Sequence, residues 1–130
     1  MRSAAYLLDT HAVLWMASRP DKLSELAKQA ILDHRYDKYV SVASAWEVAI
    51  KLSLGKLELS GGVKEFFRIC SSNGLAILNI EKAHLQLVET LPFIHRDPFD
   101  RLLIATATRE NLTLISADSH VNQYAVPCLW

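Results

Sequence analysis

The 130-residue sequence is poor in cysteine, in net charge and in long hydrophobic runs. Its two cysteines, Cys70 and Cys128, lie far apart and outside any C-x-x-C pair, so neither a disulfide framework nor a zinc site is expected. Fourteen basic residues balance fourteen acidic ones, which excludes an overall positive field that would attract nucleic acid or an anionic membrane. A polyanion would have to be bound by a local patch.

Membrane insertion and secretion are not expected either. No stretch approaches the ~18 uninterrupted apolar residues of a membrane span. The N-terminus begins like a signal peptide, but Asp9 and His11 interrupt the apolar run that such a peptide needs. With its few cysteines, the chain is typical of a protein of the reducing cytoplasm.

What the sequence does contain is an alternation of short apolar runs and longer helical patterns. Its length, with 51% hydrophobic and 22% charged residues, predicts a single domain over residues 1–130 with one compact core. The runs that predict strands are 4–8, 38–42, 75–80 and 112–116, with 126–130 as an added edge strand. The patterns that predict helices cover 11–17, 23–34, 43–54, 63–72, 81–91 and 98–110.

This alternation predicts an α/β fold with a mainly parallel sheet of four or five strands. Parallel neighbours need crossover connections, and those crossovers cover both faces of the sheet with helices. In such sheets ligands bind beyond the carboxyl ends of the strands, near the point where the strand order reverses. Polar residues that follow the predicted strands are therefore the first candidates for a site.

Acidic residues occupy these positions. Asp9 ends the first predicted strand, and Asp118 follows the strand 112–116. Asp97 and Asp100 open the helix 98–110. Each also has a simpler interpretation as a helix cap, above all Asp97, which is followed by a proline at the first helical position. We predict that Asp97 is a cap with, at most, a contact to the site.

Glu47 and Asp100 argue most directly for a site. Glu47 lies in a largely apolar helix, where an ionised carboxylate is costly unless it is paired or bound to a metal. The pairing alternative is Lys51, four residues on. Asp100 shares a helix face with the apolar residues three, four and seven positions on, so it should face the sheet.

Carboxylates that converge repel one another unless a cation neutralises them. The sequence offers oxygen ligands and no histidine or cysteine cluster at ligand spacing, which favours Mg²⁺ or Mn²⁺ over zinc. Such an ion can activate water for attack on a phosphodiester.

The same acids carry a family resemblance. Between Tyr6 and Trp130 the chain resembles the PIN-domain ribonucleases in four motifs, LLDTH, SAWEVAIK, HRDPFDRLLIA and ISAD, which contain Asp9, Glu47, Asp100 and Asp118. It is particularly similar to the VapC-type toxins of bacterial toxin–antitoxin pairs, in the branch that carries HRDPFDR and a K-x-x-x-GKL stretch, here residues 51–57.

The resemblance implies an α/β/α sandwich and a Mg²⁺-dependent endoribonuclease that cuts single-stranded regions of RNA. It also implies a homodimer that is neutralised by a cognate antitoxin. The implied catalytic set is Asp9, Glu47, Asp100 and Asp118, of which Asp9, Asp100 and Asp118 would hold the metal, with Thr10 and Ser116 beside it.

The basic residues near the acids and the overall function each leave an alternative. His95, Arg96 and Arg101 are candidates for contacts to RNA phosphates, because arginine suits bidentate contacts of this kind. For Arg101 an ion pair with a local acid is the alternative. The alternative for the whole chain is a non-catalytic interaction module whose acids only cap helices.

Overall fold

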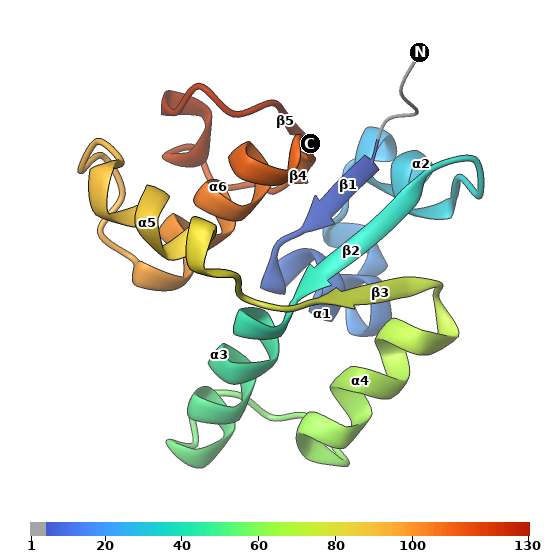
Figure 1. Ribbon diagram of the computed structural model, residues 1–130. Coiled ribbons are helices and arrows are strands. Elements are labelled where there is room, and N and C mark those ends of the chain that lie inside the picture. Colours follow the sequence, from blue (N-terminus) through green and yellow to red (C-terminus); the bar gives the residue numbers. More distant parts are fainter. Residues whose placement is uncertain (1–4) are drawn as a thin grey trace.

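The computed structural model describes residues 5–130 as a five-stranded sheet with helices on both faces (Figure 1). The strands are β1 (Ala5–Leu8), β2 (Asp37–Ser41), β3 (Leu75–Leu78), β4 (Thr113–Ile115) and β5 (Cys128–Leu129). The helices are α1 (Thr10–Ser18), α2 (Glu25–Leu32), α3 (Val42–Ser53), α4 (Gly62–Ser72), α5 (Lys82–Thr90) and α6 (Pro98–Glu110), with short 3₁₀ turns η1 (Pro20–Lys22) and η2 (Val121–Gln123).

The sheet is parallel throughout, with the strand order β3-β2-β1-β4-β5. From the central β1 the chain moves outward to β2 and β3, and then returns to the other side of β1 with β4 and β5. The strand order therefore reverses between β1 and β4. The carboxyl ends of these two strands are where a doubly wound sheet binds its ligands.

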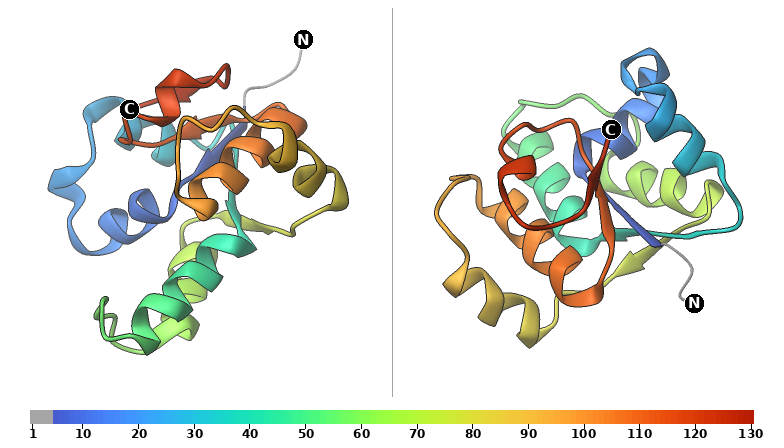
Figure 2. Two further views of the ribbon diagram at one scale, coloured as in Figure 1. Left: turned by 90° about the vertical axis from the view of Figure 1, so that its left-hand side faces the viewer. Right: turned by 90° about the horizontal axis from the view of Figure 1, so that it is seen from above.

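Two cores lie on opposite faces of the sheet because successive side chains of a strand point to opposite sides. On β1, Leu8 packs with Val13 of α1 and Phe66 of α4, whereas Leu7 packs with Leu103 and its neighbours on α6. The two views of Figure 2 show the helices of these cores on either side of the strands. The three-layer α/β/α architecture is the one predicted, with its helices as the outer layers.

The predicted elements are all present, and their boundaries differ where a cap or a turn intervenes. Val42 begins α3 and does not end β2, because the Ser41 hydroxyl caps the helix by accepting from the Ala43 N–H at 3.0 Å. The helix expected over 23–34 begins only after the Ser24 cap and ends at Leu32. Residue 4 of the first predicted strand lies outside the described part.

The edge strand predicted at 126–130 is confirmed as β5, shortened to two residues. Within residues 5–130, no helix combines the length and the hydropathy needed to cross a membrane.

Candidate active site

A cavity of about 280 Å³ opens at the carboxyl ends of β1 and β4. The residues that line it are Asp9, Thr10, His11, Trp15, Glu47, Lys51, Asp97, Asp100, Ala117 and Asp118. The four acids singled out in the sequence therefore meet, although they come from four separate segments. They meet at the point where the strand order reverses, so the fold and the acidic pattern indicate the same place.

Asp9 is both a helix cap and a wall of this cavity. Its backbone N–H donates to the Ile115 carbonyl at 3.1 Å, which extends the pairing of β1 with β4. Its Oδ1 accepts from the Ala12 N–H at 2.8 Å and caps α1. Burial raises the pKa of the Asp9 carboxyl, and the charge of Glu47 adds to the rise, against hydrogen bonds from Ser116 and Ala12. The ionised form of Asp9 is therefore energetically unfavourable, and a nearby cation would stabilise it.

Glu47 is buried at 7% exposure and is held from two sides. Its Oε1 accepts from the Thr10 hydroxyl at 2.6 Å, and its Oε2 lies 3.0 Å from the Lys51 ammonium. The ion pair between Glu47 and Lys51 is thus the one expected from their spacing of four residues. Both partners line the acidic cavity. Ser44, which the sequence did not single out, lies 2.9 Å from the Thr10 hydroxyl and completes this network.

Asp97 and Asp100 divide the roles expected of them. Asp97 caps α6, because its Oδ1 accepts from the N–H groups of Phe99 at 2.8 Å and Asp100 at 3.1 Å. Burial raises the pKa of the Asp100 carboxyl to about 7, and the charges of Asp97, Asp9 and Asp118 add to the rise. A carboxyl in this condition takes up a proton or a metal ion near neutral pH.

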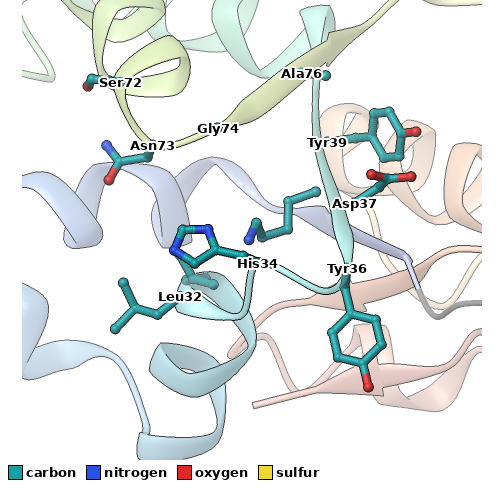
Figure 3. Close-up of a pocket in the computed structure, with 11 residues that line it drawn as sticks. Leu32, His34, Tyr36, Asp37, Tyr39, Ser72, Asn73, Gly74 and Ala76 are labelled. Atoms are coloured by element: carbon teal, nitrogen blue, oxygen red, sulfur yellow. The ribbon is translucent and has the colours of Figure 1, made fainter.

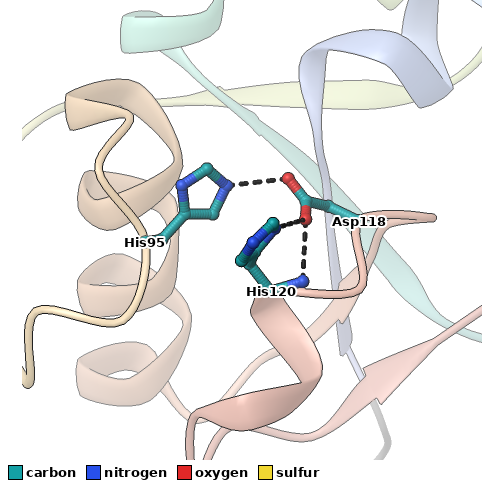
Figure 4. Close-up of side chains that lie close together, drawn as sticks. All are labelled: His95, Asp118 and His120. Atoms are coloured by element: carbon teal, nitrogen blue, oxygen red, sulfur yellow. Dashed lines mark hydrogen bonds and ion pairs between the residues drawn. The ribbon is translucent and has the colours of Figure 1, made fainter.

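Asp118 follows β4 and is flanked by two imidazoles (Figure 4). Its Oδ2 lies 2.7 Å from His95 Nε2, and its Oδ1 lies 2.8 Å from the His120 N–H and 3.2 Å from the His120 ring. Burial acts to raise the pKa of Asp118, but these hydrogen bonds outweigh it, so the pKa is lowered. Asp100 and Asp118 are thus neighbours whose pKa values are pushed apart.

Two histidines gather around Asp118, contrary to expectation. The sequence suggested no histidine cluster, yet the ligand atoms of His95, Asp118 and His120 lie within 4.8 Å of one another. His120 follows Asp118 by two residues, and that spacing was the one sign of the cluster in the sequence.

Ser116 is buried, and its hydroxyl accepts from the Asp118 N–H at 3.1 Å. Arg96 is exposed and does not line the cavity.

Within residues 5–130, Arg101 makes no ion pair with an acidic side chain, and its guanidinium contacts the backbone instead. It is only 7% exposed, and its guanidinium donates to the carbonyls of Val88 and Pro92, both at 3.0 Å. The guanidinium also lies over the Phe93 ring, 4.5 Å from its centroid. The ion pair with a local acid was wrong as an expectation, because the guanidinium donors are occupied in holding the segment between α5 and α6. A contact of Arg101 to RNA stays a prediction.

A second cavity, of about 410 Å³, lies at the amino ends of β2 and β3 (Figure 3). The ends of α2 and α4 contribute to its wall, with Lys38, whose ammonium donates to the Asp33 carbonyl at 2.9 Å. Because helix C-termini carry partial negative charge, Lys38 is accounted for as their counter-charge. Among the described residues lining this cavity only Asp37 is acidic. The cavity at the carboxyl ends of β1 and β4 differs from it in bringing several carboxylates together.

Comparisons with known proteins agree with this geometry. The family model described as PIN domain matches residues 6–127. The chain is 27% identical over 122 residues to ribonuclease VapC22 of Mycobacterium tuberculosis, covering 93% of this chain and 92% of that protein.

Solved structures of similar fold include a toxin–antitoxin complex from Klebsiella pneumoniae, with a TM-score of 0.61 at 19% identity and with 98% of this chain and 97% of that chain covered. VapBC2 from Rickettsia felis, bound to a DNA fragment from its promoter, has a TM-score of 0.74 at 15% identity, with 96% of this chain and 97% of that chain covered. VapBC-1 from nontypeable Haemophilus influenzae has a TM-score of 0.68 at 16% identity, with 96% of each chain covered. Because the family model spans nearly the whole chain and the acids meet where the fold binds ligands, the chain belongs to the PIN-domain family.

Proposed function

We propose that this protein is a divalent-metal-dependent endoribonuclease that acts as the toxin of a bacterial toxin–antitoxin pair. The observation that carries the proposal is the meeting of Asp9, Glu47, Asp100 and Asp118 in one cavity at the switch point of the sheet. Burial raises the pKa of two of these carboxyls, so their negative charge is unfavourable without a cation.

The donor set fits Mg²⁺ or Mn²⁺. Carboxylate oxygens converge on the cavity, whose volume of about 280 Å³ leaves room for the waters that these ions retain. Asp9, Asp100 and Asp118 would hold the ion, directly or through water. When bound, the ion supplies the positive charge that activates a water and offsets the charge developing on the scissile phosphate.

The remaining residues would arrange the reactants. Glu47, fixed by Thr10 and Lys51, is placed to accept a hydrogen bond from the attacking water and so to orient it. The Lys51 ammonium at the wall of the cavity offers a positive contact for an RNA phosphate. His95 lies too deep beside the acids for a primary phosphate contact, with 12% of its side chain exposed.

The competing function, an interaction module whose acids only cap helices, has some support. Asp9 and Asp97 do cap α1 and α6. Capping does not account for Glu47, which lies inside α3, nor for Asp100, whose carboxyl faces other acids. A module without an ion would hold the buried Glu47 and the half-buried Asp100 beside other acids with no use for their charge, so the nuclease is the better explanation.

The partners of the proposed toxin follow from its relatives. Ribonuclease VapC22 is named for cleavage of RNA, and the VapBC assemblies pair such a fold with an antitoxin. We therefore propose an RNA substrate, a cognate antitoxin and a homodimeric toxin acting in the cytoplasm.

Cleavage of a labelled single-stranded RNA by purified protein tests the proposal. We expect cleavage with Mg²⁺ or Mn²⁺, none with EDTA, and at least a 100-fold lower rate in Asp9→Asn and Asp100→Asn. Asp37→Asn is the matched control, because Asp37 is an exposed aspartate at the opposite end of the sheet. If wild-type protein with either ion leaves RNA intact, or if Asp37→Asn is as impaired as Asp9→Asn, the nuclease assignment fails.

A further inference from the structure

His95 occupies a bridging position between two of the acids. Its Nε2 lies 2.7 Å from Asp118 Oδ2 (Figure 4) and, outside that view, 3.0 Å from Asp100 Oδ2. These two carboxylates come from different segments, the first turn of α6 and the loop after β4. We propose that His95 is a positioning residue that holds Asp100 and Asp118 at the separation needed to share a divalent ion. This inference rests on the proposed metal-dependent function.

The backbone determines which nitrogen of the ring carries the hydrogen. The N–H of Asp97 donates to His95 Nδ1 at 3.1 Å, so Nδ1 must present its lone pair. The hydrogen of the neutral ring is then on Nε2, where it points to Asp118. His95 is therefore a hydrogen-bond donor to Asp118, and Asp100 Oδ2 lies 3.0 Å from the same nitrogen. The helix cap and the imidazole form one unit, because the same Asp97 caps α6 with its side chain.

The backbone of His95 is anchored independently of the acids. Its N–H and that of Ile94 donate to the Tyr124 hydroxyl at 2.8 and 3.1 Å, and this hydroxyl donates to the Pro92 carbonyl at 2.8 Å. Arg101 donates to the same Pro92 carbonyl at 3.0 Å and to the Tyr124 hydroxyl at 3.4 Å. The imidazole is thus attached to a fixed loop, which is what a positioning group requires.

The hydrogen on His95 Nε2 disfavours a direct role for this residue in binding metal. A group of His95, Asp118 and His120 is geometrically able to surround a zinc-like ion. A metal on His95 Nε2 would move the ring hydrogen to Nδ1, where it would oppose the N–H of Asp97. The usual arrangement is the reverse, with the second nitrogen of a metal-bound histidine donating its hydrogen. His95 is therefore assigned to the carboxylates and not to the ion.

The first test reads the tautomer without any assay of activity. Long-range ¹H–¹⁵N correlation spectra of the whole protein, free of metal and at a pH where the ring is neutral, should show His95 in the Nε2–H form. The spectrum should keep this form on addition of Mg²⁺. The Nδ1–H form, or a Zn²⁺ complex whose spectrum shows His95 Nε2 as a ligand, would overturn the assignment.

The second test measures Mn²⁺ binding by paramagnetic resonance in the absence of RNA. His95→Ala should weaken binding about 10- to 100-fold, the range typical of lost outer-shell partners. His95→Gln, whose side-chain amide can still donate near the Nε2 position, should recover most of this loss, and His34→Ala is the control at an exposed histidine. The thermal midpoint of each variant, measured beside its affinity, shows that the fold is kept.

The outcomes separate the two proposals. If wild-type protein binds Mn²⁺ and cleaves RNA while His95→Ala binds as tightly as wild type, this inference is wrong and the nuclease stands. If His95→Gln binds no better than His95→Ala, donation to the carboxylates is not the reason for the loss, and the inference is likewise wrong. If wild-type protein binds no Mn²⁺, the proposed function is wrong and the inference falls with it.

Discussion

The hydroxyl of Thr10, the first residue of α1, donates a 2.6 Å hydrogen bond to Glu47 on α3, 37 positions further along the chain. This contact joins two of the segments that form the cavity. Because both partners are buried, the carboxylate has little water to replace a lost donor. Thr10, which the family resemblance placed beside the metal, is thereby part of the support of a candidate catalytic acid.

Thr10→Val should destabilise the protein, because valine keeps the shape of threonine and removes only the donor. The expected loss in the free energy of unfolding is about 1–3 kcal/mol, the cost of a buried acceptor deprived of its partner. Urea unfolding measures it. Thr10→Ser keeps a hydroxyl and should lose less than half as much, so equal losses in the two variants would contradict a role for the hydrogen bond.

Stability without metal should fall as the pH rises from 5 to 8. The pKa of Asp100 is about 7 in the folded protein, against an ordinary value of 3.8. Between these values the folded state binds more protons than the unfolded state, so stability is highest below pH 4 to 5 for this group and is lost through pH 7. The raised pKa of Asp9 acts in the same direction.

Asp100→Asn should flatten this pH profile and raise the free energy of unfolding at pH 8 by about 1–2 kcal/mol, a value discounted for partial exposure of the carboxyl. Saturating Mg²⁺ should remove the decline in the wild-type protein, since the ion binds the deprotonated acids. Thermal unfolding across the pH range, with and without Mg²⁺, checks both. A decline that persists unchanged in Asp100→Asn would show that other groups cause it.

Local patterns predicted α6 and its cap correctly, because the information lies within a few residues. Proline at the first helical position and an aspartate before it determine where α6 begins, at Pro98 as predicted. The meeting of the acids was also predictable, since strand ends of a parallel sheet share one edge. Whether those acids bind metal remains a prediction.

What sequence reasoning missed depends on contacts between distant segments. Nothing near Arg101 shows that its donors are taken by carbonyls about ten residues earlier in the chain. The role of Tyr124 depends on a loop 29 to 32 residues before it, which only the packed structure brings together. The cluster of histidines around Asp118 was missed for the same reason, because His95 lies 23 positions from Asp118 in the chain.

Arg101→Met tests the corrected role of this residue. Methionine fills much of the buried space but removes the guanidinium donor from the carbonyls of Val88 and Pro92, which keep only the Leu91 N–H and the Tyr124 hydroxyl as donors. The free energy of unfolding should fall by about 2–3 kcal/mol. Arg96→Met, at the exposed neighbouring arginine, should change it by less than about 0.5 kcal/mol. If Arg101→Met keeps full stability and only raises the KM for RNA, the substrate contact is the better interpretation.

Tyr124→Phe should loosen the segment that carries His95 while leaving the sheet intact. The variant keeps the buried ring but deprives the N–H groups of Ile94 and His95 of their acceptor. We expect a loss of about 1–3 kcal/mol in unfolding free energy and faster hydrogen exchange at these two amides, with exchange in β1 little changed.

Tyr36→Phe is the matched control for this variant, because the Tyr36 hydroxyl has no hydrogen-bond partner recorded among residues 5–130, and its ring packs edge-on to Tyr6. If local exchange quickens in Tyr124→Phe and Mn²⁺ binding weakens with it, the loop conformation is coupled to the acids through His95. If exchange quickens while Mn²⁺ affinity is unchanged, the loop is held for stability alone. The position of the acids is then set by their own helices and strands, since α6 and β4 carry Asp100 and Asp118 directly.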